Sequence, residues 1–495
     1  MNVELDPAAG TETSDAAPTR SAAIPSPPVT AGVAEAPTEP LRRPAAAAAA
    51  GPVPLSTLLV YSSPALGQSF MFMFTGMYLL KYSTDVLGVA PAAMGMIFMV
   101  SKFWDAISDP LAGYLSDRTN TRWGRRRPWM LAGALPVCVV FFFMLTPPAS
   151  LQGGALTAWM AVCVVGFYTA MTVYNMPHDA LGAELSSDYT ERNRIFGVKR
   201  AVFGVGTVGV FGAIGFLAGS DTPREFAFSL ASITAVATLG LMVVPVFFLR
   251  ERPEFQGRGA KLPLKAVMDV LRNPHARLLV GMFFLQQIGI GGLSLMVAYW
   301  ADYVLGDAKF LSTLMMSLFL ASIVGIPFWI RLGRQYEKRS LGLVSMGIVG
   351  LALASIGLVP EGGFAITIVI AVIAGLALSC LDVILPSIQA DVIDYDEFRT
   401  GERKEGVYFA VWHLASKMAT GIAAAMVGFL LQGVGFEANA EQSPATLDAM
   451  RLLMSGFPLV VYGAGTCLFW FFSMTKQEHA DVLAALDARR SAEAR

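Results

Sequence analysis

Apolar runs of about twenty residues recur along the chain and are separated by short polar segments. A run of this length is what an α-helix needs to cross the hydrocarbon core of a bilayer. Because lipid offers the backbone no hydrogen-bonding partner, unbroken apolar runs favour helices over a barrel. The pattern predicts twelve transmembrane spans, near residues 57–80, 91–115, 128–147, 155–181, 197–220, 225–249, 275–305, 310–332, 340–359, 363–391, 405–434 and 450–473.

A polar connection divides the predicted spans into two sets of six. We expect an N-terminal half at 55–249, a cytoplasmic linker at 250–274 and a C-terminal half at 275–474. Residues 1–54 are rich in Ala, Pro, Thr and Ser and lack the pattern of a secretory signal, so we expect a disordered cytoplasmic tail. Residues 475–495 are expected to form a second cytoplasmic tail. Two six-helix halves are the plan of many secondary transporters, with the binding site between them.

Basic residues concentrate in the even-numbered connections, for example between Arg118 and Arg127, whereas the odd-numbered connections are nearly bare. The positive-inside rule then predicts a multi-pass inner-membrane protein with both termini in the cytoplasm. Composition agrees, because 55% of the residues are hydrophobic and only 15% are charged. The net charge is −1 and the basic residues form no surface stripe, so no nucleic-acid partner is expected.

Two carboxylates interrupt the second span in the sequence WDAISDP. Asp105 and Asp109 are four positions apart and therefore share one helical face, which Lys102 joins one turn earlier. Inserting one charged side chain near the bilayer centre costs about 2.5–3.5 kcal/mol. Two neighbouring carboxylates are therefore stable there only when a cation neutralises them or one of them is protonated. The pair is interpreted as a cation-binding element, with an oxygen of Ser108 close by. The alternative is that both residues only anchor the loop that follows.

Lys417 is a second charge inside an apolar run, in the eleventh span. No acidic residue is near it in sequence, so its partner must come from another helix, and Asp105 or Asp109 would serve. His413 lies one turn earlier on the same face and is either a hydrogen-bonded core residue or a proton relay. Lys417 is interpreted as a charge that draws the two halves together when no cation is bound.

The fourth span ends in MTVYNMPHDALGAEL, where Pro177 should disrupt the regular hydrogen-bond ladder. Polar groups would then face a cavity. The candidate pocket residues are Thr172, Asn175, His178 and Asp179, although Asp179 can equally lie at the membrane surface. The G-x-G-x-x-G at Gly204–Gly209 lies inside a span and follows no strand, so it is interpreted as a helix-packing motif. No catalytic constellation is present, so no enzyme activity is expected.

Several motifs resemble those of the glycoside–pentoside–hexuronide:cation symporters, the melibiose-permease-like branch of the major facilitator superfamily. They are KFWDAISDPLAGYLSDRTNTRWGRRRPW, MYLLKYSTDVLGV, NMPHDALGAELSSDYTERNR and DVIDYDEFRTGERKEGVYFAVWHLASK, and the resemblance covers roughly residues 55–475. It implies an all-α membrane protein with the major facilitator fold. It also implies that Asp105 and Asp109 bind Na⁺, Li⁺ or H⁺, that Thr172 assists, and that Lys417, Lys102 and Arg200 match family positions.

The sugar-reading positions of the melibiose permease are changed in this chain. Ser69, beside Gln68, stands where that permease has its first sugar-reading aspartate. Asn175 stands at the second, and Asp179 replaces a neighbouring tryptophan. The resemblance therefore implies a different glycoside or a non-sugar solute. Candidate pocket residues are Gln68, Asn175, His178, Asp179, Arg200 and His413.

We expect a monomeric transporter that moves a sugar or glycoside together with H⁺ or Na⁺ and needs no further cofactor. Asp117, Arg118 and Arg126 are assigned to a cytoplasmic gate. Two alternatives stay open. One is a symporter of a non-sugar solute such as a lysolipid. The other is a sensor or scaffold that retains the fold without transport.

Overall fold

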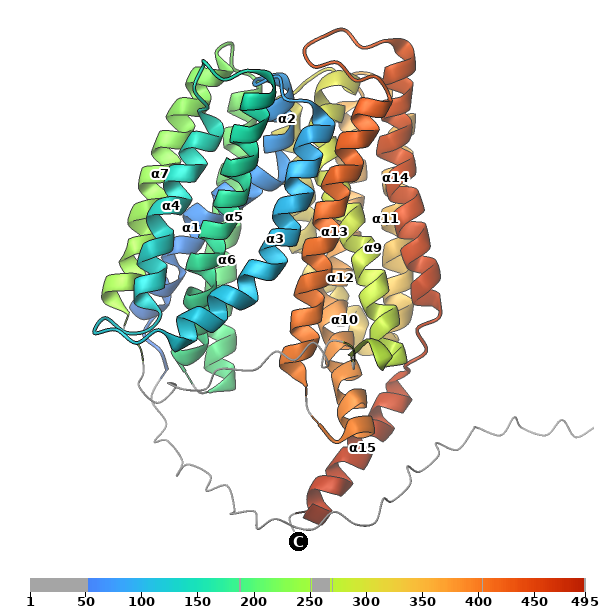
Figure 1. Cartoon of the computed structure of the whole chain (residues 1–495). Coiled ribbons are helices and arrows are strands. Elements are labelled where there is room, and N and C mark those ends of the chain that lie inside the picture. The colour runs from blue at the N-terminus through green and yellow to red at the C-terminus, as the bar shows by residue number, and fades with distance from the viewer. Residues whose placement is uncertain are drawn as a thin grey trace, which may run out of the picture. The chain divides into compact units, whose positions relative to one another are not determined.

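The computed structural model describes residues 52–186, 188–249, 251, 268, 270–402 and 404–493. The predicted tail at 1–54 lies outside these residues except for its last three positions, and most of the predicted linker at 250–274 lies outside them too. Figure 1 shows the helices packed side by side as a bundle. Ten helices in the described part of the chain are long and apolar enough to cross a membrane.

The helices of the N-terminal half are α1 (Leu55–Met77), α2 (Leu79–Asp85), α3 (Pro91–Arg118), α4 (Arg127–Leu145), α5 (Gly153–Glu184), α6 (Tyr189–Ala218) and α7 (Pro223–Phe248). Neither α1 nor α3 is among the ten most apolar spans, although α3 has 28 residues and α1 has 23. The first predicted span is two helices, because α1 ends at Met77 and α2 continues to Asp85.

The C-terminal half consists of α9 (Pro274–Tyr299), the π-helical turn η2 (Trp300–Val304), α10 (Phe310–Gln335), α11 (Lys338–Ser355), the 3-10 turn η3 (Ile356–Leu358), α12 (Phe364–Thr400), α13 (Glu405–Gly433) and α14 (Pro444–Trp470). A further helix, α15 (Lys476–Glu493), occupies the predicted C-terminal tail. It contacts α12 through pairs such as Arg490 with Glu397, at 2.8 Å.

Local sequence sets several helix ends. Prolines open α3, α7, α9 and α14, where the missing N–H of proline costs nothing. The side chains of Asp188, Asn273 and Ser443 accept hydrogen bonds from the first turns of α6, α9 and α14. The disruption of the hydrogen-bond ladder expected at Pro177 does not end the helix. Helix α5 runs through it to Glu184, because a proline inside a long packed helix removes a single backbone hydrogen bond.

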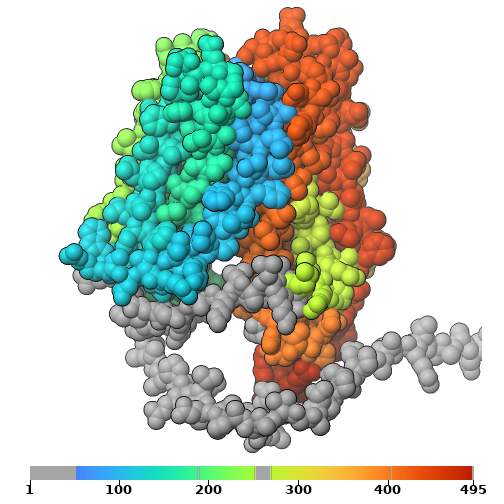
Figure 2. Space-filling model, viewed as in Figure 1, coloured from blue at the N-terminus to red at the C-terminus, as the bar shows by residue number. Residues whose placement is uncertain are grey.

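The closest contact between the halves is the packing of α3 against α13. A Cβ added to Gly95 would lie 2.6 Å from the carbonyl oxygen of Ala424, and one on Gly428 would lie 2.4 Å from that of Pro91. Such small residues let two backbones approach, which is how membrane helices gain packing energy. Beyond Asp109, α3 contains Pro110 and turns away from α13 toward the lower end of Figure 1. Figure 2 shows the surface of α3 (blue) in contact with that of α13 (orange) along the upper part of the bundle.

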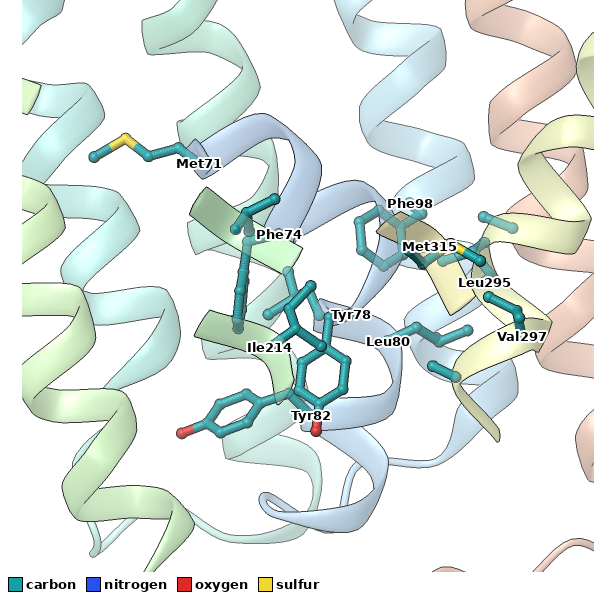
Figure 3. Packing of buried hydrophobic residues seen from close by; sticks show 14 of the residues in the cluster. Met71, Phe74, Tyr78, Leu80, Tyr82, Phe98, Ile214, Leu295, Val297 and Met315 are labelled. Carbon is teal, nitrogen blue, oxygen red and sulfur yellow. The ribbon is translucent and has the colours of Figure 1, made fainter. Parts of the chain in front are cut away.

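The bundle has two ends, called here the basic end and the opposite end. The basic end is the one where α3 finishes at Arg118 and α5 at Glu184, and the opposite end is the one where α2 finishes at Asp85 and η2 at Val304. One large apolar cluster is shared by both halves (Figure 3). Its members include Met71, Phe74, Tyr78, Leu80, Tyr82, Phe98, Ile214, Leu295, Val297 and Met315.

Candidate functional site

The candidate site lies where the middle of α3 meets α13. Asp105 is 14 positions into α3, about 21 Å from its start. Its side chain is buried, with 7% of the residue exposed, and Asp109 one turn later is partly buried. The two carboxylates therefore lie deep in the bundle, on the helix face that points to the other half.

Lys417 of α13 pairs with both carboxylates. Its Nζ lies 2.9 Å from Oδ2 of Asp105 and makes an even closer contact with Oδ2 of Asp109. The pairing joins residues about 310 positions apart in sequence and so connects the two halves. A second ammonium, that of Lys102, makes no direct ion pair with the carboxylates but interacts electrostatically with both.

Thr172 of α5 completes this cluster. Its hydroxyl oxygen lies 2.7 Å from Oδ1 of Asp105 and 2.7 Å from Oδ1 of Asp109. A hydroxyl has a single proton to donate. It can satisfy one carboxylate, and the second close contact between oxygens is favourable only when a proton or a cation lies between them. Thr172 thus bridges the two carboxylates from a third helix.

The other two residues predicted for this site have different surroundings. The hydroxyl of Ser108 donates to the backbone carbonyl of Asp105, at 3.4 Å, rather than facing the carboxylates. The ammonium of Lys102 lies 3.6 Å from the ring centroid of Tyr168 and 5.2 Å from that of Phe72. An aromatic face stabilises a cation there. The structure thus gives Lys102 an aromatic environment beside the cluster.

The candidate pocket residues differ in how exposed they are and in which partners they have. The Gln68 side chain donates from Nε2 to Oδ1 of Asn175, at 2.9 Å, which links α1 to α5. Arg200 and His413 are exposed on α6 and α13. His178, by contrast, is fully buried: its Nε2–H donates to the backbone carbonyl of Tyr61 at 2.9 Å and its ring stacks on the Tyr61 ring, so it offers no surface to a solute in this arrangement.

Asp179 pairs with Lys199 of α6, within the N-terminal half. Asp382 is a further acidic residue, at the middle of α12. It is exposed, and the guanidinium of Arg200 interacts with it electrostatically although the two residues belong to different halves. In the sequence, Asp382 is distinguished as an acidic residue in the centre of the most apolar span.

The residues predicted for a cytoplasmic gate lie at the basic end. Arg126 pairs with Asp117 at 3.5 Å and with Glu184 of α5 at 2.8 Å, and Arg125 contacts Glu184 more closely. Arg118 instead lies over the ring of Tyr114, at 4.2 Å. The Asp117–Arg126 pair and the Glu184 pairs all lie within the N-terminal half.

The carboxylate of Glu251, which follows α7, accepts hydrogen bonds from the backbone N–H groups of Arg125, Arg126 and Arg127. It thereby binds the start of α4, where a negative charge is favoured. Sequence reasoning missed both Glu184 and Glu251, because acidic residues next to a basic loop carry no distinctive spacing.

Comparison with known proteins gives consistent matches over nearly the whole described bundle. Residues 60–476 match the family described as "MFS/sugar transport protein". The isoprimeverose transporter of Lactiplantibacillus pentosus is 26% identical, over 92% of this chain and 96% of that protein. A putative glycoside/cation symporter of Escherichia coli, YagG, is 26% identical over 82% of this chain and 89% of its own length. The crystal structure of a D-xylose-proton symporter aligns with a TM-score of 0.61 at 12% identity, over 85% of this chain and 98% of that one, and shows the shared fold.

Proposed function

The chain belongs to the MFS/sugar transport protein family, a family of multi-pass membrane transporters, and from this premise we propose that it carries a sugar or glycoside in symport with H⁺ or Na⁺. The family match also agrees with the resemblance that the motifs indicate. The names of two relatives support the substrate class, because one is an isoprimeverose transporter and the other a putative glycoside/cation symporter.

The observation that carries the proposal is the buried cluster in which Asp105 and Asp109, bridged by Thr172, pair with Lys417 of the other half. Two carboxylates face one ammonium, and the single hydroxyl of Thr172 contacts both. A coupling ion would take the place of the Lys417 ammonium at the carboxylates, either as a proton on one of them or as a small cation that their oxygens coordinate. No cofactor beyond this ion is proposed.

The proposed solute site borders the coupling site. Asn175, whose amide is held by that of the buried Gln68, belongs to the N-terminal half, and Arg200 interacts electrostatically with Asp382 of the C-terminal half. Amides, a guanidinium and a carboxylate are the groups that hydrogen-bond sugar hydroxyls well. Because these residues come from both halves, a bound solute would contact both and could be released when the halves separate.

Coupling would follow from competition for the carboxylates. When the ion binds at Asp105 and Asp109, it replaces Lys417 as the counter-charge of the two carboxylates, and the link between α3 and α13 weakens. The protein then favours the conformations that accept solute, and the loaded bundle rocks to its other state. One charge that crosses the membrane gains about 2.3 kcal/mol per 100 mV, which can drive accumulation.

The proposal places the protein in the inner membrane as a monomer, with both termini in the cytoplasm. The basic residues of the even-numbered connections support this orientation, since they lie at the basic end of the bundle. The basic end is then cytoplasmic and the opposite end faces outward.

Uptake by purified protein in liposomes tests this function. A panel of mono- and disaccharides, glycosides and one lysolipid is offered under an imposed inward Na⁺ gradient, an inward H⁺ gradient, or neither. We expect concentrative uptake of at least one sugar or glycoside with one of the two gradients. Uptake of the lysolipid alone, or no gradient-dependent uptake of any solute, would contradict the proposal.

A further inference from the structure

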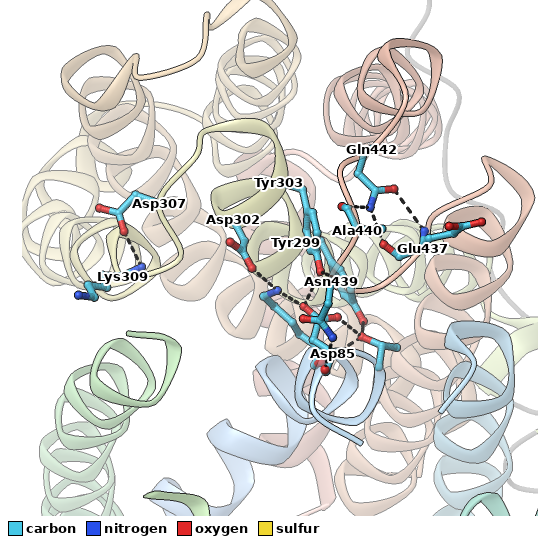
Figure 4. Close-up of polar contacts among 12 residues, drawn as sticks. Asp85, Tyr299, Asp302, Tyr303, Asp307, Lys309, Glu437, Asn439, Ala440 and Gln442 are labelled. Carbon is cyan, nitrogen blue, oxygen red and sulfur yellow. Dashed lines mark hydrogen bonds and ion pairs between the residues drawn. The ribbon is translucent and has the colours of Figure 1, made fainter. Parts of the chain in front are cut away.

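A second cluster of charges bridges the halves at the opposite end of the bundle (Figure 4). The ammonium of Lys81, in α2, is buried, with 3% of the residue exposed. It pairs with Asp85 of the same helix and with Oδ2 of Asp302 in η2, at 2.6 Å. One of its carboxylate partners therefore belongs to each half.

Aromatic residues of the C-terminal half enclose this ammonium. Its Nζ lies 4.7 Å from the ring centroid of Tyr303 and 5.4 Å from that of Tyr299. The hydroxyl of Tyr303 donates to Oδ2 of Asp85 at 3.0 Å, and the hydroxyl of Tyr299 lies 2.9 Å from that of Thr84. Two further polar contacts thus cross between α2 and the end of α9.

The connection between α13 and α14 closes over the same cluster. The backbone N–H of Asn439 donates to the Tyr303 hydroxyl at 3.0 Å, and its side-chain amide donates to the backbone carbonyl of Asp85 at 2.5 Å. Asn439 has a φ of 57° and is the one non-glycine residue with positive φ in the described part of the chain. Asparagine tolerates this left-handed conformation better than most residues, which lets the loop present both donors inward.

The contacts of Lys81 differ in what happens when the halves separate. Lys81 and Asp85 are one turn apart on α2, so their pair moves with the N-terminal half and survives. The contacts of Asp302 with Lys81, of the Tyr303 hydroxyl with Asp85 and of the Asn439 side chain with Asp85 cross the divide and must break. Separation therefore leaves Lys81 paired but leaves Asp302 without its lysine.

We propose that Lys81, Asp85 and Asp302 form the gate that holds the opposite end shut, and that Asp302 is the residue whose pairing sets how often this end opens. This inference rests on the proposed transport function, since a gate has meaning only where the two halves alternate. The central Lys417 contact also joins the halves, but the coupling ion competes with it. Once the ion is bound, the gate cluster still links the halves by charge.

A cysteine placed beneath the gate reports its opening. Ser294 lines a small cavity together with Met77 and Met315, from both halves. It is eight residues before Asp302, about 12 Å deeper along α9. Of the native cysteines Cys138, Cys163 and Cys380 are buried and Cys467 is exposed. The parent protein for the experiment is therefore Ser294→Cys with Cys467→Ser.

The measurement is the rate at which a membrane-impermeant maleimide modifies this cysteine in membrane vesicles. The reagent is added from the side of the opposite end, using vesicles of each orientation. Loss of an inter-half contact worth one to two kcal/mol changes a two-state ratio by about 5- to 30-fold. We expect Asp302→Asn to speed modification by about this factor.

Asp307→Asn is the matched control. Asp307 lies at the same end and carries the same charge, but its carboxylate accepts from the backbone N–H of Lys309, at 2.9 Å, within one half (Figure 4). It should react at the parent rate. Tyr303→Phe keeps every charge and deletes the hydroxyl that contacts Asp85 and Asn439, so it should give a smaller increase than Asp302→Asn.

If Asp302→Asn does not fold, Tyr303→Phe still decides the question. Equal rates for parent, control and whichever gate variant folds would overturn the gate. So would an equal rise in the Asp302→Asn and Asp307→Asn proteins, since that would indicate a general effect of lost charge. The proposed transport function is tested separately, because a parent protein that carries no solute of the panel fails that proposal whatever the labelling rates are.

Discussion

Removing Lys417 should tighten the binding of the coupling ion and stop net transport. In the structure its ammonium occupies the position next to Asp105 and Asp109 that the ion requires. An ion that enters the native site must displace this ammonium. In a Lys417→Ala protein no ammonium is ion-paired with the two carboxylates, so the ion has no bound group to displace.

The size of the effect follows from the contact. At 2.9 Å and an effective dielectric constant of about 20, one such ion pair is worth about 6 kcal/mol before desolvation is subtracted. Truncating one partner of a buried pair costs about 3–5 kcal/mol. The side chains of Lys417 and Asp109 are 23% and 21% exposed, so solvent screens part of the interaction. A net competition of about 2 kcal/mol is reasonable, which corresponds to about 30-fold tighter ion binding.

Isothermal titration calorimetry of the purified protein with Na⁺, at two fixed pH values, measures this affinity directly, and proton binding is measured by potentiometric titration. Lys338→Ala serves as the control, because Lys338 pairs with Asp391 at 2.5 Å inside the C-terminal half, far along the chain from the cluster. The control should bind the ion as the native protein does. Lys417→Ala should also fail to accumulate solute in liposomes, since an occupied site is not discharged.

A Lys417→Ala protein with native ion affinity and native accumulation would refute the competition. Weaker ion binding would refute it as well, because it would mean that the lysine helps to build the site rather than occupying it. Only tighter binding together with lost accumulation agrees with the account.

Three further changes test separate contacts. Thr172→Val deletes the hydroxyl shared by both carboxylates and should weaken ion binding by about tenfold, whereas Thr157→Val on the same helix, whose hydroxyl bonds only the backbone of Gly153, should leave it unchanged; calorimetry distinguishes them, and equal affinities would remove Thr172 from the site. Gln68→Ala should raise the half-saturating solute concentration in uptake assays with little change in ion affinity, and an unchanged solute dependence would exclude it from the solute site. Glu184→Gln leaves Arg125 and Arg126 without their buried partner and should lower the free energy of unfolding by about 2–3 kcal/mol, visible as a lower thermal midpoint in detergent; an unshifted midpoint would show that the cluster adds no stability.

The helices follow closely from the apolar pattern. The predicted third span, 128–147, corresponds to α4 at Arg127–Leu145, and the eleventh, 405–434, to α13 at Glu405–Gly433. The apolar run decides these ends because lipid tolerates no unsatisfied backbone. The first span differs, since α2 extends seven residues beyond α1. Its polar residues, Lys81 and Asp85 among them, end the apolar run before the helix ends.

The sequence could place Asp105 and Asp109 on one face, because four positions on a helix fix their relative direction. It could propose Lys417 as a partner only by elimination, since every buried charge needs a counter-charge. The exact contact depends on how α3 packs on α13, which is set by the approach of Gly95 and Gly428. No local pattern encodes that approach.

Other features depended on long-range packing and were not foreseen. His178 looked like a pocket residue because it follows Asn175 and Pro177, yet its ring packs on Tyr61 inside the N-terminal half. The Lys81–Asp302 pair joins residues 221 positions apart and has no sequence signature. Asp302 is visible in the sequence only as a polar residue inside an apolar run, and nothing in that run connects it with Lys81.

The most direct test of the coupling site is concentrative uptake under one fixed inward ion gradient, measured for the native protein and for Asp105→Asn and Asp109→Asn. The account predicts that the native protein accumulates its solute above the external concentration. Each variant should at most equilibrate it, with no response when the gradient is reversed. Accumulation by either variant with the native dependence on the ion would contradict the assignment of the coupling site to these two carboxylates.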